Sequence, residues 1–182
     1  MRKFCANYCL ILILMGSSCS PRMGNIDEYK LEVFADYFQI YIQTASTLES
    51  EELGVEWSEQ ELKRLLQVKK EEFVIGTARN MVVPFFIKIY PEKPEINLDN
   101  WDMVNESEIK VTGNILYINS MDDEISIPLD SGVYGFYTLY KNLDAISQDG
   151  LDGDDEYYLY LWKTSKASQT ADVMELKSKN LL

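Results

Sequence analysis

Apolar residues recur at every second position along most of this chain. Phe38, Ile40 and Ile42 lie two residues apart, and the same spacing runs from Val83 to Ile89. Successive side chains of a β-strand point to opposite faces of a sheet, so this spacing predicts strands with one buried face. Further segments with this pattern lie at 31–33, 109–111, 116–118, 125–129, 133–140 and 157–162.

These short segments are rich in Val, Ile, Tyr and Phe, and Gly, Asp, Asn and Pro separate them. That arrangement is typical of antiparallel sandwiches and barrels. We therefore predict a mainly β fold, an antiparallel two-sheet sandwich of about eight strands that occupies residues 27–162. A polar C-terminal tail over 163–182 is expected to be mobile, except around Val173 to Leu176.

One short packed helix is predicted near residues 58–70. Ser58 and Glu61 have the spacing of a capping box, and Trp57 precedes the cap where a hydrophobic staple begins. Lys69 and Lys70 would then lie in the last turn, where cations suit the helix dipole. The predicted apolar face of this helix consists of Leu62, Leu65 and Leu66.

The chain contains no histidine. This excludes Ser/His/Asp and Cys/His nucleophile systems and zinc sites that rely on imidazole. The formal net charge of −13 also argues against nucleic-acid binding, which needs a basic face. We therefore expect a binding protein without catalytic residues, metal or cofactor.

Residues 1–18 have the layout of a secretory signal peptide. Arg2 and Lys3 precede an apolar run, and small residues precede Cys19. This placement resembles a bacterial lipoprotein signal, in which the cysteine receives a lipid, although Gly16 stands where such signals usually carry Leu. The resemblance implies a lipid-anchored envelope protein with Cys19 as the attachment site and 19–26 as a tether. Ordinary signal cleavage, giving a soluble periplasmic or secreted protein, is the alternative.

The most acidic part of the chain is the window 122–156, in which ten carboxylates accompany one base, Lys141. Concentrated negative charge costs stability by self-repulsion and attracts cationic partners, so it favours a basic protein partner. A solubilising acidic face is the alternative. The predicted partner-binding residues are Asp149, Asp152, Asp154, Asp155 and Glu156.

Three other interpretations of this region remain open. The stretch 149–156 is rich in oxygen ligands but lacks the EF-hand spacing, so a tight turn with Gly150 and Gly153 is favoured over a calcium site. Paired carboxylates would serve a glycosidase, although acidic residues are too abundant here to be specific. Exposed aromatics on the Tyr-rich strands would suit a carbohydrate- or envelope-binding module.

Four further residues are assigned structural roles. We expect Arg79 to clamp a carboxylate, either Asp102 or one in the acidic window. Trp101 is expected to pin the connection 91–107 to the core. Trp162 ends the last predicted strand.

Several segments in order resemble the competence nuclease-inhibitor (competence protein J-like) family. These are Phe38 to Ile42 with Trp57, then GTARN and VPF at 76–80 and 83–85, WDMVNE at 101–106, Gly113, and GLDGDDEYYLYLW at 150–162. The resemblance implies a compact β-rich domain, no catalysis, and inhibition of a nuclease by direct binding. The export signal departs from the family pattern, so the resemblance does not identify the partner, and no contact residue is carried over. We expect the chain to bind and inhibit a basic protein, a nuclease or a toxin.

Overall fold

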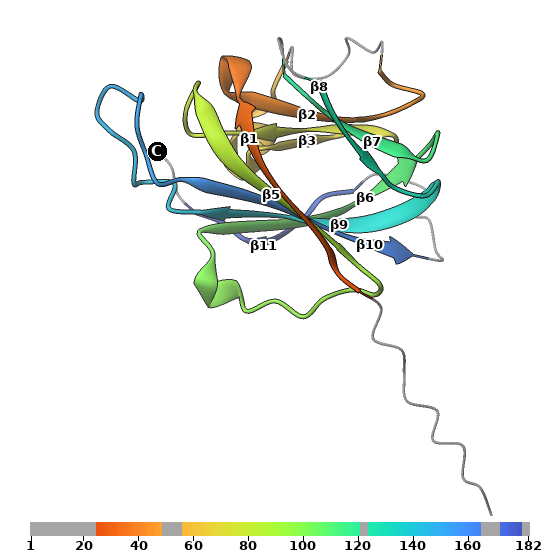
Figure 1. The fold of residues 1–182 in the computed structure, drawn as a ribbon. Helices are drawn as coiled ribbons and strands as arrows, with labels where there is room; N and C mark the ends of the chain where they lie inside the picture. The colour runs from red at the N-terminus through yellow and green to blue at the C-terminus, as the bar shows by residue number, and fades with distance from the viewer. Residues whose placement is uncertain (1–24, 49–55, 121–123, 165–171, 180–182) are drawn as a thin grey trace, which may run out of the picture.

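Two β-sheets pack face to face in the computed structural model, which describes residues 25–48, 56–120, 124–164 and 172–179 (Figure 1). The elements in chain order are β1 (Asp27–Phe34), η1 (Asp36–Phe38), β2 (Gln39–Thr44), α1 (Glu59–Arg64), β3 (Leu66–Val68), β4 (Glu72–Gly76), β5 (Val82–Tyr90), η2 (Leu98–Asn100), β6 (Met103–Val111), β7 (Ile115–Asn119), β8 (Glu124–Pro128), β9 (Gly132–Lys141), β10 (Glu156–Thr164) and β11 (Met174–Lys177).

The first sheet has six strands in the order β1-β5-β10-β9-β6-β11, and the second has five in the order β3-β4-β2-β7-β8. All neighbours are antiparallel except β5 and β10, which run parallel. The predicted two-sheet sandwich is confirmed. The described residues hold more strands than the eight expected for two reasons. β3 and β11 are too short to show a period of two, and β4 is buried at every position and so does not alternate.

The core lies between the two sheets, where the alternating residues meet. Phe73 of the five-stranded sheet stacks on Phe136 of the six-stranded sheet with ring centroids 4.2 Å apart. Val83, Phe85 and Ile87 of β5 are each at most 1% exposed. Removing this apolar surface from water is the main stabilising contribution to such a sandwich.

The predicted capping box is present, but the helix is shorter than predicted. Ser58 N–H donates to Glu61 Oε2 at 2.8 Å, and Glu61 N–H donates to Ser58 Oγ at 3.3 Å. The helix ends at Leu65, whose left-handed φ of 49° closes it. Leu66 then enters β3 and is fully buried, whereas Leu62 is 55% exposed. Lys69 and Lys70 therefore follow a strand and do not lie in a helical turn.

Part of the predicted tail belongs to the six-stranded sheet. β11 pairs with β6, and Ser107 Oγ donates to the Asp172 carbonyl oxygen at 2.9 Å. The predicted signal peptide 1–18, Cys19 and most of the predicted tether 19–26 lie outside the described residues. Among the described residues, no helix is long and apolar enough to cross a membrane.

Candidate functional site

The connection between β9 and β10, residues 142–155 (here called the acidic loop), folds back on itself as a small ordered hairpin at the edge of the molecule (Figure 1). Ile146 and Gly153 form an antiparallel bridge, and Ser147 N–H donates to the Asp152 carbonyl oxygen at 2.7 Å. Gly150 has a φ of +70°, as the predicted tight turn requires. A Cβ at Gly153 would lie 2.8–2.9 Å from Asp155, Ala145 and Ile146, so that glycine is needed for close packing.

A buried ion pair fixes the base of the acidic loop. Arg79 Nε donates to Asp155 Oδ1 at 2.5 Å, and Arg79 Nη1 donates to the Leu151 carbonyl oxygen at 3.3 Å. Arg79 thus pairs with a carboxylate of the acidic window and not with Asp102. The side chain of Asp155 is 0% exposed, so Asp155 cannot contact a partner directly, although it was predicted to do so. It holds the loop in place instead.

Tyr157 completes this buried network. Its hydroxyl donates to Asp155 Oδ2 at 2.7 Å and accepts from the Ala78 N–H at 2.7 Å. Burial raises the pKa of the Tyr157 hydroxyl, and the nearby Asp155 carboxylate raises it further. The hydroxyl therefore stays protonated and continues to donate at any physiological pH.

The remaining carboxylates of this region fall into two groups. Lys179 Nζ lies 2.6 Å from Asp144 and 3.2 Å from Asp102, whose other contact is the Leu143 N–H at 2.8 Å. Glu156 accepts from the Tyr158 hydroxyl at 2.7 Å and lies 3.9 Å from Lys141 Nζ. The second group is exposed and forms no ion pair with any described residue: Asp149, Asp152 and Asp154.

Asp149 is held in its ionised form. The Ser147 hydroxyl donates to its Oδ1 at 2.6 Å and the Leu151 N–H at 3.2 Å, and these bonds hold the pKa of the Asp149 carboxyl below its usual range. The acidic loop thus presents fixed negative charge to solvent at neutral pH.

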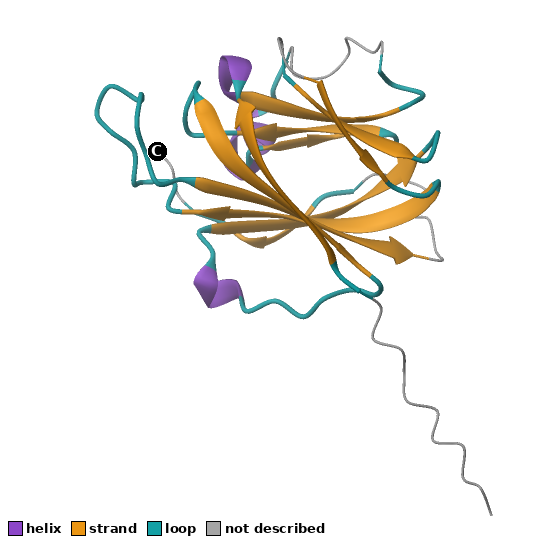
Figure 2. Ribbon diagram, in the orientation of Figure 1, coloured by secondary structure: helices purple, strands orange, loops and turns teal. Residues whose placement is uncertain are grey.

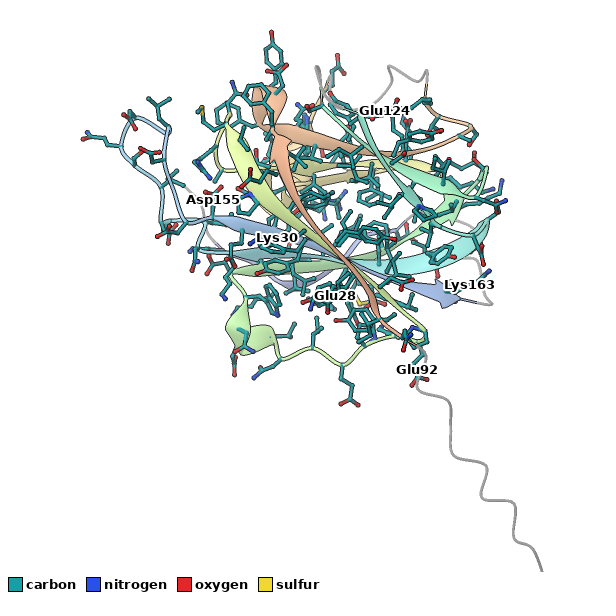
Figure 3. All side chains as sticks on the ribbon, in the orientation of Figure 1. Glu28, Lys30, Glu92, Glu124, Asp155 and Lys163 are labelled. Carbon is teal, nitrogen blue, oxygen red and sulfur yellow. The ribbon has the colours of Figure 1, made fainter. Side chains whose placement is uncertain are left out.

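The acidic window does not form one surface, contrary to the sequence-based expectation. Figure 3 shows Glu124 and Asp155 on different sides of the molecule. β9 is ten residues long, so Asp130 in the turn before it lies about 30 Å, at ~3.4 Å per residue, from Asp155 beside its far end. Asp122 and Asp123 lie outside the described residues. Of the described part of the window, the acidic loop alone remains as a concentrated negative site.

The outer face of the six-stranded sheet is rich in aromatic side chains, but their rings already contact one another. Phe86 stacks on its cross-strand partner Tyr158 with centroids 4.6 Å apart. Lys30 Nζ lies 5.5 Å from the Phe86 ring centroid, and Trp101 and Tyr158 form a T-shaped contact with centroids 4.9 Å apart. Both rings of this stack thus have further neighbours, whereas a sugar-binding platform needs a ring face open to solvent.

Other aromatics of the six-stranded sheet have structural contacts. Trp162 lies 4.6 Å from Tyr137, and a Cβ at Gly135 would lie 2.5 Å from the Trp162 ring. Trp101 packs on the outer face beside η2, in the connection that runs below the sheet in Figure 2. Trp57 is partly buried next to the helix cap. Three of the six tyrosines of β9 and β10 face the core: Tyr134, Tyr140 and Tyr157.

The linings of two clefts can be compared with what a binding or catalytic site requires. One, of about 470 Å³, lies between the acidic loop and the β4–β5 connection, with Leu65, Ala78, Leu143 and Ile146 among its mainly apolar lining. The other, of about 510 Å³, includes two exposed carboxylates, Asp27 and Asp130. A glycosidase acid needs a carboxyl group in an environment that raises its pKa, which solvent exposure does not supply. Among the described residues, no group of three or more acidic side chains is arranged to hold a metal ion.

Two exposed aromatics, Tyr37 and Phe38, were not predicted from the sequence. Phe38 was expected on the buried face of a strand, but it ends η1 and is 51% exposed, while Tyr37 is 70% exposed. Both have left-handed backbone, with φ of 50° and 63°. No turn residue such as Gly or Asn marks this conformation in the sequence. The period-two spacing of Phe38, Ile40 and Ile42 therefore wrongly predicted that Phe38 is buried.

Comparison with known proteins identifies a similar fold and no family. No family model and no curated protein matches the chain. Among solved structures it is similar to ComJ, inhibitor of the DNA degrading activity of NucA, from Bacillus subtilis, with a TM-score of 0.61 and 14% identity over 78% of this chain and 100% of that one. It is also similar to the product of crocagin biosynthetic gene J, with a TM-score of 0.48 and 13% identity over 76% and 97% of the two chains. The sequence-based resemblance is thus matched at the level of the fold.

Proposed function

We propose that this protein is a non-enzymatic inhibitor whose acidic loop binds a basic protein, a nuclease or a delivered toxin, and blocks it. The observation that carries the proposal is the group of three exposed carboxylates, Asp149, Asp152 and Asp154, on a loop fixed by the buried Arg79–Asp155 pair. A rigid array of negative charge can imitate the spaced phosphates that a nuclease recognises. It also steers a cationic partner into place before contact.

The fold shared with ComJ supports this proposal, because that protein inhibits the DNA degrading activity of NucA. Inhibition would follow from steric cover of the partner's active site together with charge mimicry. We further propose that the protein acts at the bacterial cell envelope, tethered by a lipid on Cys19. That location rests on residues 1–19 of the sequence.

A nuclease-inhibition assay tests the proposed function. The probes are NucA and a panel of cationic nucleases with isoelectric points above about 9. We expect one or more of them to lose activity on DNA or RNA in proportion to added protein. The triple variant D149N/D152N/D154N should weaken inhibition about tenfold or more at low salt.

The matched control removes the same number of charges elsewhere. Glu92, Glu95 and Asp99 are exposed carboxylates in the connection below the six-stranded sheet. The variant E92Q/E95Q/D99N should inhibit as the wild type does. Equal weakening by both triple variants would contradict a role for the acidic loop, and an absence of inhibition across the panel would contradict nuclease inhibition itself.

A further inference from the structure

Large apolar side chains are exposed at one end of the sandwich. Tyr37 is 70% exposed, Phe38 51%, Val82 50% and Leu151 53%. These four residues, here called the loop-end patch, belong to the β1–β2 connection, the start of β5 and the acidic loop. Large exposed aromatic residues are unusual away from binding surfaces, where Tyr and other aromatics supply most of the binding energy.

Hydrogen bonds hold these segments side by side through the β4–β5 connection. On one side, Thr77 N–H donates to the Phe38 carbonyl oxygen at 2.8 Å, and Ala35 N–H donates to the Met81 carbonyl oxygen at 3.0 Å. On the other side, Arg79 contacts both Leu151 and Asp155. Figure 1 shows η1, the β4–β5 connection and the β9–β10 connection gathered at the same end of the molecule.

The backbone at Tyr37 and Phe38 is held in a conformation that bulky residues avoid. Two consecutive non-glycine residues in the left-handed region are strained, because Cβ approaches the neighbouring carbonyl oxygen. The exposed aromatic rings gain little burial in return. Strain of this kind persists where the surrounding structure enforces it, and it often marks a functional surface.

The charges around the patch indicate the chemistry of the partner. The connections 35–38, 77–81 and 142–155 carry six aspartates and one arginine, and that arginine is neutralised by Asp155. Within the described residues, Asp36, Asp149, Asp152 and Asp154 form no ion pair. An apolar patch with an anionic surround is complementary to a protein surface in which Lys or Arg residues surround an apolar pocket.

We propose that Tyr37 and Phe38, with Val82 and Leu151 at the same end of the sandwich, are the apolar anchors that a cationic protein partner covers. This inference rests on the proposed function and adds to it a second set of contacts, those between the apolar anchors and the partner. Carboxylates of the acidic loop would set the rate of association, and the aromatic anchors would set the rate of dissociation.

An NMR titration of the isotope-labelled full chain tests the inference. The probes are a short peptide that alternates lysine with tryptophan and leucine, and its twin with glutamate in place of lysine. We expect the lysine peptide to shift the amide signals of Tyr37, Phe38 and Leu151 together with those of 149–154. The glutamate twin should shift none of them.

Variants then separate the two sets of contacts. In Y37N/F38N, asparagine tolerates the left-handed backbone, so the fold is retained while the rings are lost. We expect the dissociation constant for the lysine peptide to rise at least about tenfold, with no loss of melting temperature. The control Met174→Ser removes an equally exposed apolar residue from β11, at the opposite edge of the six-stranded sheet from β1, and should change neither quantity.

The outcomes distinguish this inference from the proposed function. Signal shifts confined to the acidic loop, with Y37N/F38N binding as the wild type does, would overturn the anchor role and leave the charged loop in place. Weaker binding by Y37N/F38N while D149N/D152N/D154N binds normally would support the anchors and contradict charge steering. Shifts located on the outer face of the six-stranded sheet would overturn both.

Discussion

The outer face of the six-stranded sheet and the loop end of the sandwich contain similar residues in different states. On the outer face, Phe86, Tyr158 and Trp101 contact one another, and Lys93 Nζ lies 2.6 Å from Glu106 and 5.4 Å from the Tyr137 ring centroid. At the loop end, aromatic rings and carboxylates face solvent. The rings and charges named on the outer face already contact partners, whereas Tyr37 and Phe38 at the loop end are exposed to solvent; this difference is why we place the proposed binding surface at the loop end.

The largest expected effect comes from breaking the support of the loop end. Arg79→Ala leaves Asp155 buried without its cation, and we expect the free energy of unfolding to fall by about 3–5 kcal/mol. Urea unfolding at neutral pH measures this change. The same variant should release the acidic loop and weaken binding of the lysine peptide.

The outer face offers the control for this prediction. Lys88 pairs with Glu28 at 2.8 Å in a partly exposed position, so Lys88→Ala should cost less than about 1 kcal/mol. A cost for Arg79→Ala no larger than that of Lys88→Ala would show that the buried pair does not support the loop.

A smaller effect is expected where the outer face is tightly packed. Gly135→Ala places a Cβ 2.5 Å from the Trp162 ring, so the ring must move, and we expect a loss of about 1–3 kcal/mol in unfolding free energy. The near-UV circular dichroism of the tryptophans should change with it. At the loop end, no atom lies within 4 Å of a Cβ built at Gly150, and asparagine tolerates the left-handed φ of +70° there, so Gly150→Asn should change both quantities much less.

The smallest expected effect is a pH dependence at the loop end. The hydrogen bonds of Asp149 lower the pKa of its carboxyl in the folded state, so this group favours folding above its unfolded pKa of about 3.9. That contribution is lost as pH falls through the folded value. Asp149→Asn should therefore reduce stability slightly at neutral pH, and the difference from wild type should disappear in strong acid.

Urea midpoints at neutral pH and in strong acid test this dependence. The Asp152 carboxylate accepts no hydrogen bond from the described residues, so Asp152→Asn should leave the midpoint unchanged at both. A stability difference between Asp149→Asn and wild type that persists in strong acid would contradict the role given to these hydrogen bonds.

The sandwich was predictable because period-two spacing is strong wherever a strand crosses the core. β5 alternates between buried and partly exposed residues over most of its length, as its sequence indicates. In β9 and β10 the side chains alternate between the core and a second apolar cluster on the outer face. The helix near Ser58 was predicted too long because the leucines after Leu62 fit a helix and a strand equally well. The five-stranded sheet recruits Leu66 into β3, and this tertiary packing overrides the local pattern.

The candidate site was only partly predictable, since charge density along a chain does not measure distance in space. Asp130 and Asp155 both belong to the acidic window 122–156, but the length of β9 separates them. The burial of Asp155 was open to prediction, because Asp155 lies two residues before Tyr157 and four before Leu159, and both of those side chains face the core from β10. Its burial therefore follows the same rule that predicts the strand.

The left-handed backbone at Tyr37 and Phe38 had no comparable signal. Their conformation is imposed by contacts with the β4–β5 connection, which lies about forty residues away along the chain. Local sequence carries no record of such a contact, so the exposed apolar part of the site emerges only from the folded structure.

The salt dependence of association with a cationic nuclease tests the central claim most directly. For the wild type, we expect the association rate constant to fall by about tenfold or more between roughly 0.01 M and 0.15 M salt, as charge steering is screened. The dependence should be much flatter for D149N/D152N/D154N and unchanged for E92Q/E95Q/D99N. Parallel salt dependences for all three proteins would contradict the claim that the acidic loop recruits the partner.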